Sequence, residues 1–201
     1  MQIMNHRLIG DAGHAVTYDP SPNQSGTVTP LYLVIHYTAG TSSASAVSWL
    51  KNPASNASAH LVIDRDGSIV QLVPFNRRAW HAGVSQWGQL SGLNQYSIGI
   101  ELVNAGKLRK RSDGQWLTES KQLIPAADVT VARHQNESES TGWHEYTDVQ
   151  IATVTAVGQL LNQKYGFTDV LGHDDIAPTR KIDPGPLFPM NSVRGRILGR
   201  S

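Results

Sequence analysis

The chain has 201 residues, of which 39% are hydrophobic and 16% are charged, and its formal net charge at pH 7 is +1. This length and composition predict one globular domain with a full hydrophobic core. The small net charge gives no electrostatic basis for binding nucleic acid or an anionic membrane, and the absence of cysteine excludes thiolate ligands, disulfides and cysteine nucleophiles.

The first 30 residues are polar and rich in turn-forming residues, as in the segment Asp-Pro-Ser-Pro-Asn-Gln-Ser-Gly at 19–26. We therefore expect a mostly irregular lead-in over residues 1–30 and a single domain over residues 31–201. The N-terminal segment 1–10 lacks the apolar core of a secretion signal, and no later run is apolar and long enough to cross a bilayer.

The first half of that domain shows strand signals separated by one helix. The apolar run at 31–37 predicts a buried strand, and the spacing of Ala, Val and Trp at 43–50 predicts a short helix that stops near Asn52-Pro53. The segments 60–64 and 69–73 flank Arg-Asp-Gly-Ser, which indicates a hairpin. Alternation over 97–103 predicts another strand.

The second half begins with residues 105–147, which have no clean period and predict a long surface excursion. A helix is expected over 148–165, with Thr147 or Asp148 as its N-cap and Gly166 beyond its end. A short strand over 167–171 and a terminal helix over 191–198 follow. The alternation of elements predicts an α/β fold, a single domain with a central mixed β-sheet flanked by helices and an active site at strand ends.

The segment 173–186, His-Asp-Asp-Ile-Ala-Pro-Thr-Arg-Lys-Ile-Asp-Pro-Gly-Pro, carries the most chemistry. It supplies an imidazole ligand in His173, a carboxylate ligand in Asp183 and, in Lys181, a cation that could stabilise an oxyanion. His36, at the end of the first strand, is the candidate third ligand. Each residue alone is more typical of a structural role, but together they predict a hydrolytic Zn²⁺ site with its fourth position open.

Glu101 is a carboxylate within the otherwise apolar strand at 97–103. If it faces the protein interior, its burial is costly without a purpose, and it could accept the proton of an attacking water. Strand alternation equally allows it to face solvent, because Ile98, Ile100 and Leu102 share the opposite face. The pattern alone leaves both interpretations open.

The remaining histidines divide into two groups. His60 starts a strand and could be a ligand or a structural residue, whereas His81 follows Trp80 in a glycine-containing loop that suits substrate contact or simple packing. Asp174 and Asp175 are expected to begin a short helical turn. The others lie in polar segments and are expected to titrate in solvent: His6, His14, His134 and His144.

Five motifs occur in one order along the chain: Val-Ile-His-Tyr-Thr-Ala at 34–39, Ala-Ser-Ala-His-Leu-Val-Ile-Asp-Arg-Asp-Gly at 57–67, Ala-Trp-His-Ala-Gly at 79–83, Asn-Gln-Tyr-Ser-Ile-Gly-Ile-Glu-Leu at 94–102, and the segment from Gly172 to 186. Over about residues 31–190 this order resembles the zinc-dependent N-acetylmuramoyl-L-alanine amidases. That superfamily includes bacterial muropeptide-recycling amidases, phage lysozyme-type amidases and animal peptidoglycan recognition proteins.

The resemblance implies a role for each candidate residue. His36, His173 and Asp183 would hold one Zn²⁺, Glu101 would act as the general base, and Lys181 would stabilise the tetrahedral intermediate. The implied reaction is hydrolysis of the amide between the lactyl group of N-acetylmuramic acid and L-alanine of the stem peptide. Substrate contacts are predicted for four further residues: Trp80, His81, His60 and Asn94.

The residues at two positions make this sequence resemble the bacterial recycling branch more than the other branches. Ala59 stands where the phage and recognition-protein branches have a tyrosine, and the third ligand is Asp183 instead of cysteine. The expected partner is peptidoglycan or a muropeptide, with the choice between them open, and the expected oligomeric state is a monomer. Without a visible signal, a cytoplasmic or phage-borne protein is expected, or an envelope protein if a signal has been removed.

Two other functions compete with this prediction. Some relatives bind peptidoglycan without cutting it, but those typically lack a metal ligand, whereas this chain has all five groups, three ligands, a base and a cation. A metallo-endopeptidase that cuts within the stem peptide would also need a metal site, but no feature of the chain requires it.

Overall fold

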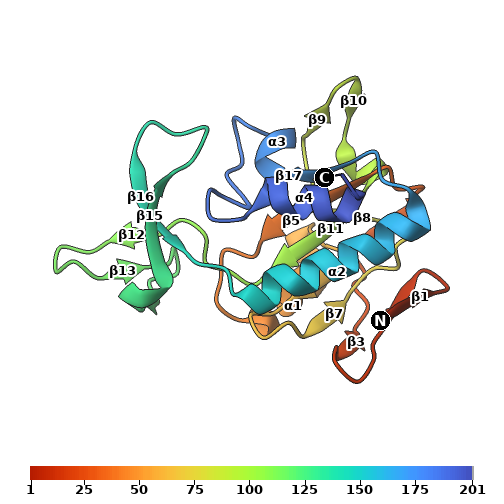
Figure 1. Ribbon diagram of the computed structural model, residues 1–201, viewed down its shortest axis with the longest axis horizontal. Helices are drawn as coiled ribbons and strands as arrows, with labels where there is room; N and C mark the ends of the chain where they lie inside the picture. The colour runs from red at the N-terminus through yellow and green to blue at the C-terminus, as the bar shows by residue number, and fades with distance from the viewer. Residues whose placement is uncertain (201) are drawn as a thin grey trace.

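The computed structural model describes residues 1–200, which form a central sheet with helices on both faces (Figure 1). The sheet has six strands in the order β17-β5-β11-β6-β7-β3. Neighbouring strands are parallel except for the antiparallel pair β6 and β7, so the predicted mixed sheet and the hairpin are confirmed. The strands are β3 (Val16–Tyr18), β5 (Tyr32–Tyr37), β6 (Leu61–Ile63), β7 (Ile69–Gln71), β11 (Ser97–Leu102) and β17 (Asp169–Gly172).

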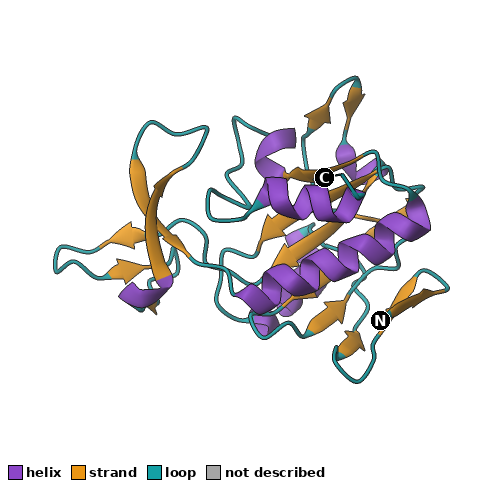
Figure 2. Cartoon of the chain, viewed as in Figure 1, coloured by secondary structure: helices purple, strands orange, loops and turns teal. Residues whose placement is uncertain are grey.

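Two helices cover one face of the sheet, and a third covers the other (Figure 2). Apolar residues of α2 (Asp148–Tyr165) and α4 (Met190–Leu198) form the main core with one face of β5 and β11, while α1 (Ser43–Lys51) packs through Leu50 on the opposite face.

Within residues 1–200, no helix combines the length and the hydropathy needed to cross a membrane.

The predicted ends of α2 are confirmed. Thr147 is its N-cap and forms a capping box with Gln150, and Gly166 ends the helix with φ of 67°, a left-handed conformation that favours glycine. The strand expected at 167–171 instead covers Asp169–Gly172, so that it ends immediately before α3 (His173–Ile176). Asp175 caps this short helix by accepting a hydrogen bond from the backbone N–H of Gly172, as expected of a helical turn beginning there.

Strand alternation in β5 decides which side chains reach the functional face. Leu33 and Ile35 point into the core shared with α2, whereas Val34 lies in a separate cluster on the other side. His36 therefore projects on the side away from α2. Glu101 of β11 is its register partner, and paired residues of parallel strands project to the same face, so the two side chains are neighbours there.

The first 30 residues contain more structure than their turn-rich sequence predicts. Besides β3, they form β1 (Gln2–Met4), β2 (Arg7–Ile9) and β4 (Gln24–Thr27). These strands have three or four residues each, too few to show a period, and β3 and β4 gain partners from distant segments, β7 and β8 (Arg77–Ala79). Short elements elsewhere are β9 (Gln86–Trp87), β10 (Leu90–Ser91), η1 (Pro53–Ser55) and η2 (Leu93–Gln95).

The excursion at 105–147 folds into two small sheets beside the central sheet (Figure 1). Its hairpin is tied to the segment after α3: the ring of Trp143 lies against Gly185, and the hydroxyl of Tyr146 donates to the carbonyl oxygen of Pro184 at 2.8 Å. The elements are β12 (Arg109–Lys110), β13 (Trp116–Leu117), β14 (Leu123–Ile124), η3 (Ala126–Asp128), β15 (Val129–Arg133) and β16 (Ser140–His144).

The expectation that His134 and His144 titrate in solvent is wrong. Both are buried, with 1% and 5% of their surfaces exposed. His134 stacks on Trp143 and bonds Asp174, and His144 accepts a hydrogen bond from the backbone N–H of Ala105. The residues that these histidines contact are remote in the sequence, which is why local polarity did not indicate their burial.

Candidate metal centre

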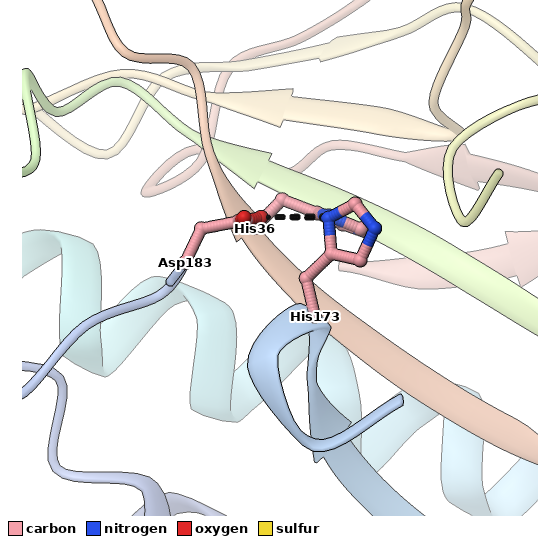
Figure 3. Close-up of side chains that lie close together, drawn as sticks. All are labelled: His36, His173 and Asp183. Carbon is pink, nitrogen blue, oxygen red and sulfur yellow. Dashed lines mark hydrogen bonds and ion pairs between the residues drawn. The ribbon is translucent and has the colours of Figure 1, made fainter. Parts of the chain in front are cut away.

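Three side chains from separate segments converge at the carboxyl end of β5 (Figure 3). His36 comes from β5, His173 from the start of α3, and Asp183 from the loop that follows α3. The Nδ1 atoms of the two histidines are 2.9 Å apart, and they lie 3.0 and 2.9 Å from Oδ2 of Asp183. All three residues are buried, so this group could hold a metal ion.

The donor set and its size suit zinc. Two imidazole nitrogens and one carboxylate oxygen form a three-ligand set of the kind found in catalytic zinc sites. Bonds of about 2.0–2.1 Å in a tetrahedral arrangement separate ligand atoms by about 3.3 Å. The observed separations of 2.9–3.0 Å need to widen by only a few tenths of an ångström, which is within the reach of side-chain rotation.

The electrostatics of the group favour the ligand forms of its members. Burial lowers the pKa of His36 to about 4, and the nearby charge of His173 adds to the shift, so His36 is neutral at pH 7. Burial raises the pKa of Asp183, but the close contacts of its carboxylate with the imidazoles of His173 and His36 outweigh it and hold this pKa well below the usual range. A neutral imidazole and an ionised carboxylate are the forms that bind metals.

Glu101 lies next to this group on the neighbouring strand. Its register partner is His36, and its Oε2 atom is buried without a hydrogen-bond partner among the described residues. Burial raises the pKa of the Glu101 carboxyl well above its usual range, the negative charge of Asp183 adds to the shift, and the ammonium of Lys181 opposes it. An orphaned carboxylate oxygen beside a metal-ligand set has the properties of a general base.

Lys181 lies in the segment between α3 and Asp183 and is partly exposed. Its positive charge contributes to lowering the pKa of His36 and partly offsets the raised pKa of Glu101. The backbone N–H of Lys181 donates to the carbonyl oxygen of Ala177, so the segment continues the last turn of α3. The backbone of Lys181 is therefore held between α3 and Asp183, two residues before the candidate carboxylate ligand.

The residues predicted to contact the substrate lie beside the candidate ligands or next to residues that do. His81 is 8% exposed, and its Nδ1 lies 3.0 Å from Nε2 of His36. Asn94 uses its Oδ1 to accept hydrogen bonds from the backbone N–H groups of His81 and Ala82. Trp80 is partly exposed, and its indole N–H donates to the hydroxyl of Ser25.

His60 is fully buried, and both of its ring nitrogens have backbone partners. Its Nε2 lies 2.9 Å from the carbonyl oxygen of Arg77, and its Nδ1 accepts a hydrogen bond from the N–H of Gly99. No polar atom of His60 is left to contact a ligand. Its position ties the start of β6 to β11 and to β8, which is a structural role.

Two residues near the centre had no signal in the sequence. Ser97 begins β11 and contacts His81, and Arg180 donates to the carbonyl oxygens of Ala82 and Val84. Ser97 lies in a predicted strand, but only the register of that strand brings its hydroxyl to His81. Arg180 lies 96 residues after Val84, and no local pattern connects the two.

Comparison with known protein families identifies the family. The Amidase_2 model, N-acetylmuramoyl-L-alanine amidase, matches residues 26–186. The chain therefore belongs to this family. The match includes all five residues of the predicted metal site and catalytic pair.

Curated relatives are similar over most of the chain. The chain is 39% identical over 143 residues to the 1,6-anhydro-N-acetylmuramyl-L-alanine amidase AmpD of Escherichia coli K12, a match that covers 70% of this chain and 57% of the relative. It is 33% identical over 179 residues to the N-acetylmuramoyl-L-alanine amidase AmiD of the same organism, covering 83% of this chain and 53% of the relative. The chain thus spans little more than half the length of these curated relatives.

Solved structures confirm the fold. A selenomethionine derivative of AmpD superposes with a TM-score of 0.68 at 27% identity, covering 96% of this chain and 99% of the other. AmiD of Escherichia coli, solved with anhydro-N-acetylmuramic acid-L-Ala-D-γ-Glu-L-Lys, gives a TM-score of 0.62 at 31% identity and covers 84% and 57% of the two chains. The predicted α/β architecture is therefore that of the family.

Proposed function

We propose that this protein is a zinc-dependent N-acetylmuramoyl-L-alanine amidase. The observation that carries the proposal is the convergence of His36, His173 and Asp183 beside Glu101, whose buried Oε2 lacks a hydrogen-bond partner in the described part of the chain. The proposed reaction is hydrolysis of the amide that joins the lactyl group of N-acetylmuramic acid to L-alanine of the stem peptide. Family membership and the named activities of the relatives support this choice.

The two histidines and Asp183 would hold one Zn²⁺ at the carboxyl end of β5. A zinc ion bound there would polarise the substrate carbonyl and lower the pKa of the attacking water. Three protein ligands leave a fourth position free for the reacting groups, which is the arrangement of catalytic zinc sites.

Glu101 would take the proton of the attacking water. Its buried Oε2 has no hydrogen-bond partner among residues 1–200, and burial raises the pKa of this carboxyl group toward the range where a carboxylate is an effective base. The same carboxyl group would return the proton to the amine of the departing L-alanine. Both transfers need only one side chain that reaches the water and the scissile nitrogen in turn.

Lys181 would stabilise the negative charge that develops on the carbonyl oxygen in the transition state. Its charge acts electrostatically on both Glu101 and His36, which supports a role for the cation at this site. A cation in this position supplies the same type of stabilisation as an oxyanion hole.

We propose muropeptides that carry anhydro-muramic acid as the preferred substrate class. Three relatives support this choice: AmpD, named for the 1,6-anhydro sugar, AmiD, and AmpDh3 of Pseudomonas aeruginosa, solved with an anhydromuramic pentapeptide. The match with AmpDh3 has a TM-score of 0.60 at 30% identity and covers 93% of this chain and 65% of the other. Intact peptidoglycan is the alternative substrate.

The deciding experiment is mass spectrometry of the products from purified peptidoglycan and from an anhydro-muropeptide, with added zinc and with a chelator. We expect zinc-dependent release of a free stem peptide that starts at L-alanine, faster from the anhydro-muropeptide. Peptidoglycan that is bound but not cut would replace the proposal with a non-catalytic binding module. Cleavage within the stem peptide would replace it with an endopeptidase.

A further inference from the structure

One loop supports both candidate histidine ligands from behind. Nε2 of His36 lies 3.0 Å from Nδ1 of His81, and Nε2 of His173 lies 3.2 Å from the carbonyl oxygen of Ala82. Asn94 holds these two loop residues in place, because its Oδ1 accepts from the N–H of His81 at 2.9 Å and from that of Ala82 at 2.7 Å. The adjacent residues His81 and Ala82 therefore contact the Nε2 atoms of His36 and His173, respectively.

The direction of the hydrogen bonds around His81 follows from a chain of partners. The hydroxyl of Ser97 donates to the carbonyl oxygen of Leu93 at 2.6 Å, and a carbonyl can only accept. The Ser97 oxygen is therefore free to accept the Nε2–H of His81 at 3.3 Å. In a neutral His81 the other nitrogen, Nδ1, then carries a lone pair.

That lone pair determines the tautomer of His36. Nδ1 of His81 accepts, so Nε2 of His36 must carry the proton that is donated across the 3.0 Å contact. Nδ1 of His36 is left with a lone pair that faces His173 and Asp183. This is the form in which an imidazole binds a metal.

His173 reaches the same state by a different route. Its Nε2 donates to the carbonyl oxygen of Ala82, so its Nδ1 also faces the cluster as a lone pair. Nη2 of Arg180 lies 3.5 Å from that Nε2, but its two hydrogens are directed to the carbonyl oxygens of Ala82 and Val84, at 2.9 and 2.8 Å. Arg180 thus fastens the loop and leaves the tautomer of His173 unchanged.

The close approach of His81 depends on Gly99 of β11. A Cβ atom at this position would lie 2.4 Å from Cγ of His81, which no side chain tolerates. Glycine here lets the imidazole ring lie flat against the strand between Ser97 and His36. The glycine in Ser-Ile-Gly-Ile-Glu thus has a packing reason that is separate from Glu101.

We propose that His81 is a positioning residue, which, together with Ser97 and the Asn94-held carbonyl of Ala82, fixes both histidine ligands as Nε2–H tautomers with Nδ1 directed at the metal. This assignment replaces the substrate contacts predicted for His81 and Asn94 from the sequence. It rests on the proposed metal site but does not depend on hydrolysis, since it concerns the ligands before any substrate binds. Partners of this kind typically account for about 10–100-fold in metal affinity.

The test compares truncation of His81 with truncation of its neighbour His60. Both are buried histidines whose ring centroids lie 5.8 Å apart, but the ring of His60 makes its hydrogen bonds to the backbone groups of Arg77 and Gly99. Zinc alone is titrated into the metal-free, full-length protein against a chelating indicator. We expect His81→Ala to weaken zinc binding by about 10–100-fold and His60→Ala to leave it near that of the parent protein.

A rescue variant separates positioning from packing. In His81→Asn, the amide oxygen lies close to the place of Nδ1 and can accept from His36, so part of the lost zinc affinity should return. An equal loss of affinity in His81→Ala and His60→Ala, or no loss in His81→Ala, would overturn the proposal. If truncation of His81 prevents folding, Ser97→Ala tests the same chain of hydrogen bonds, with a smaller loss of zinc affinity expected.

A spectroscopic measurement needs no substitution. Long-range ¹H–¹⁵N correlation spectra of the metal-free protein distinguish the two histidine tautomers directly. We expect His36 and His173 as Nε2–H forms before zinc is added. An Nδ1–H form of His36 would overturn the proposal, while failure to hydrolyse a muropeptide would bear only on the proposed function.

Discussion

Two buried histidine–aspartate groups lie close together in this protein, and their chemistry differs. In the metal centre, Asp183 faces two histidines, His36 and His173, whose inner nitrogens both carry lone pairs in the proposed tautomers. In the excursion, His134 receives the N–H of Asn136 on Nδ1 and donates its Nε2–H to Asp174 at 2.9 Å. Asp174 therefore accepts a hydrogen bond from His134. In the proposed tautomers, neither His36 nor His173 donates a proton to Asp183.

The difference teaches how to tell a metal site from a structural pair when no metal is present. Burial raises the pKa of Asp174, and its bond from His134 offsets only part of that shift, while the pKa of Asp183 is held well below the usual range. In the His134–Asp174 pair, the donor and the acceptor satisfy each other by hydrogen bonding. The pair also joins the β15–β16 hairpin to the start of α3. The Asp183 group needs a cation to balance converging lone pairs.

The largest expected effect comes from an isosteric change in each carboxylate. Asp183→Asn removes the anionic ligand, so we expect zinc binding to be lost and hydrolysis to fall by at least about 10³-fold. Asp174→Asn is the matched control in the same segment, and it should keep its zinc. Isothermal titration with zinc and product analysis measure both effects, and similar losses in the two variants would erase the distinction between the groups.

Glu101→Gln should separate catalysis from metal binding within the metal centre. The amide keeps the size of the side chain but cannot take a proton, so turnover should fall by about 10²–10⁴-fold. Zinc content, measured by atomic emission, should stay at that of the parent protein. Turnover near the parent value would exclude Glu101 as the base.

Lys181→Ala tests the remaining catalytic group. Loss of a group that stabilises an oxyanion costs about 10²–10³-fold in turnover, and Lys181→Arg should restore part of it because the positive charge remains. Steady-state kinetics should show the loss mainly in kcat. A change confined to KM would show that Lys181 binds the substrate without stabilising the transition state.

His134→Ala should affect stability instead of chemistry. Removing one partner of a buried pair leaves Asp174 with only the weaker donor Gln135, so unfolding should become easier by about 3 kcal/mol. Zinc affinity should be unchanged. Urea denaturation measures the loss of stability, and a large loss of zinc binding in this variant would mean that the two groups act as one.

Another buried histidine, His60, gives the smallest expected effect. Burial lowers the pKa of His60 to about 4, below its unfolded value of about 6.5, so the unfolded state binds its proton first as the pH falls. Stability is present above pH 6.5 and is lost on acidification, by about 2 kcal/mol at pH 5. Comparing denaturation of the parent and His60→Gln from pH 7 to pH 5 isolates this contribution, and identical slopes would contradict it.

Much of the fold could be predicted from local pattern. The apolar run before His36, the capped helix ending at Gly166, and the hairpin around Gly67 each depend on neighbours within a few residues. The short N-terminal strands and the excursion could not be predicted, since strands of two to five residues show no clear period and pair with one another or with remote segments.

The sequence by itself determined which chemistry is available: two histidines, a carboxylate, a base and a lysine in an order shared with one amidase family. Only the tertiary structure decided how they are used. The side to which Glu101 points follows from its register with His36, because both faces of the sheet are covered and alternation cannot choose between them. The role of His81 likewise depends on Ser97 and Asn94, since hydrogen bonds between remote segments form only once the chain has folded.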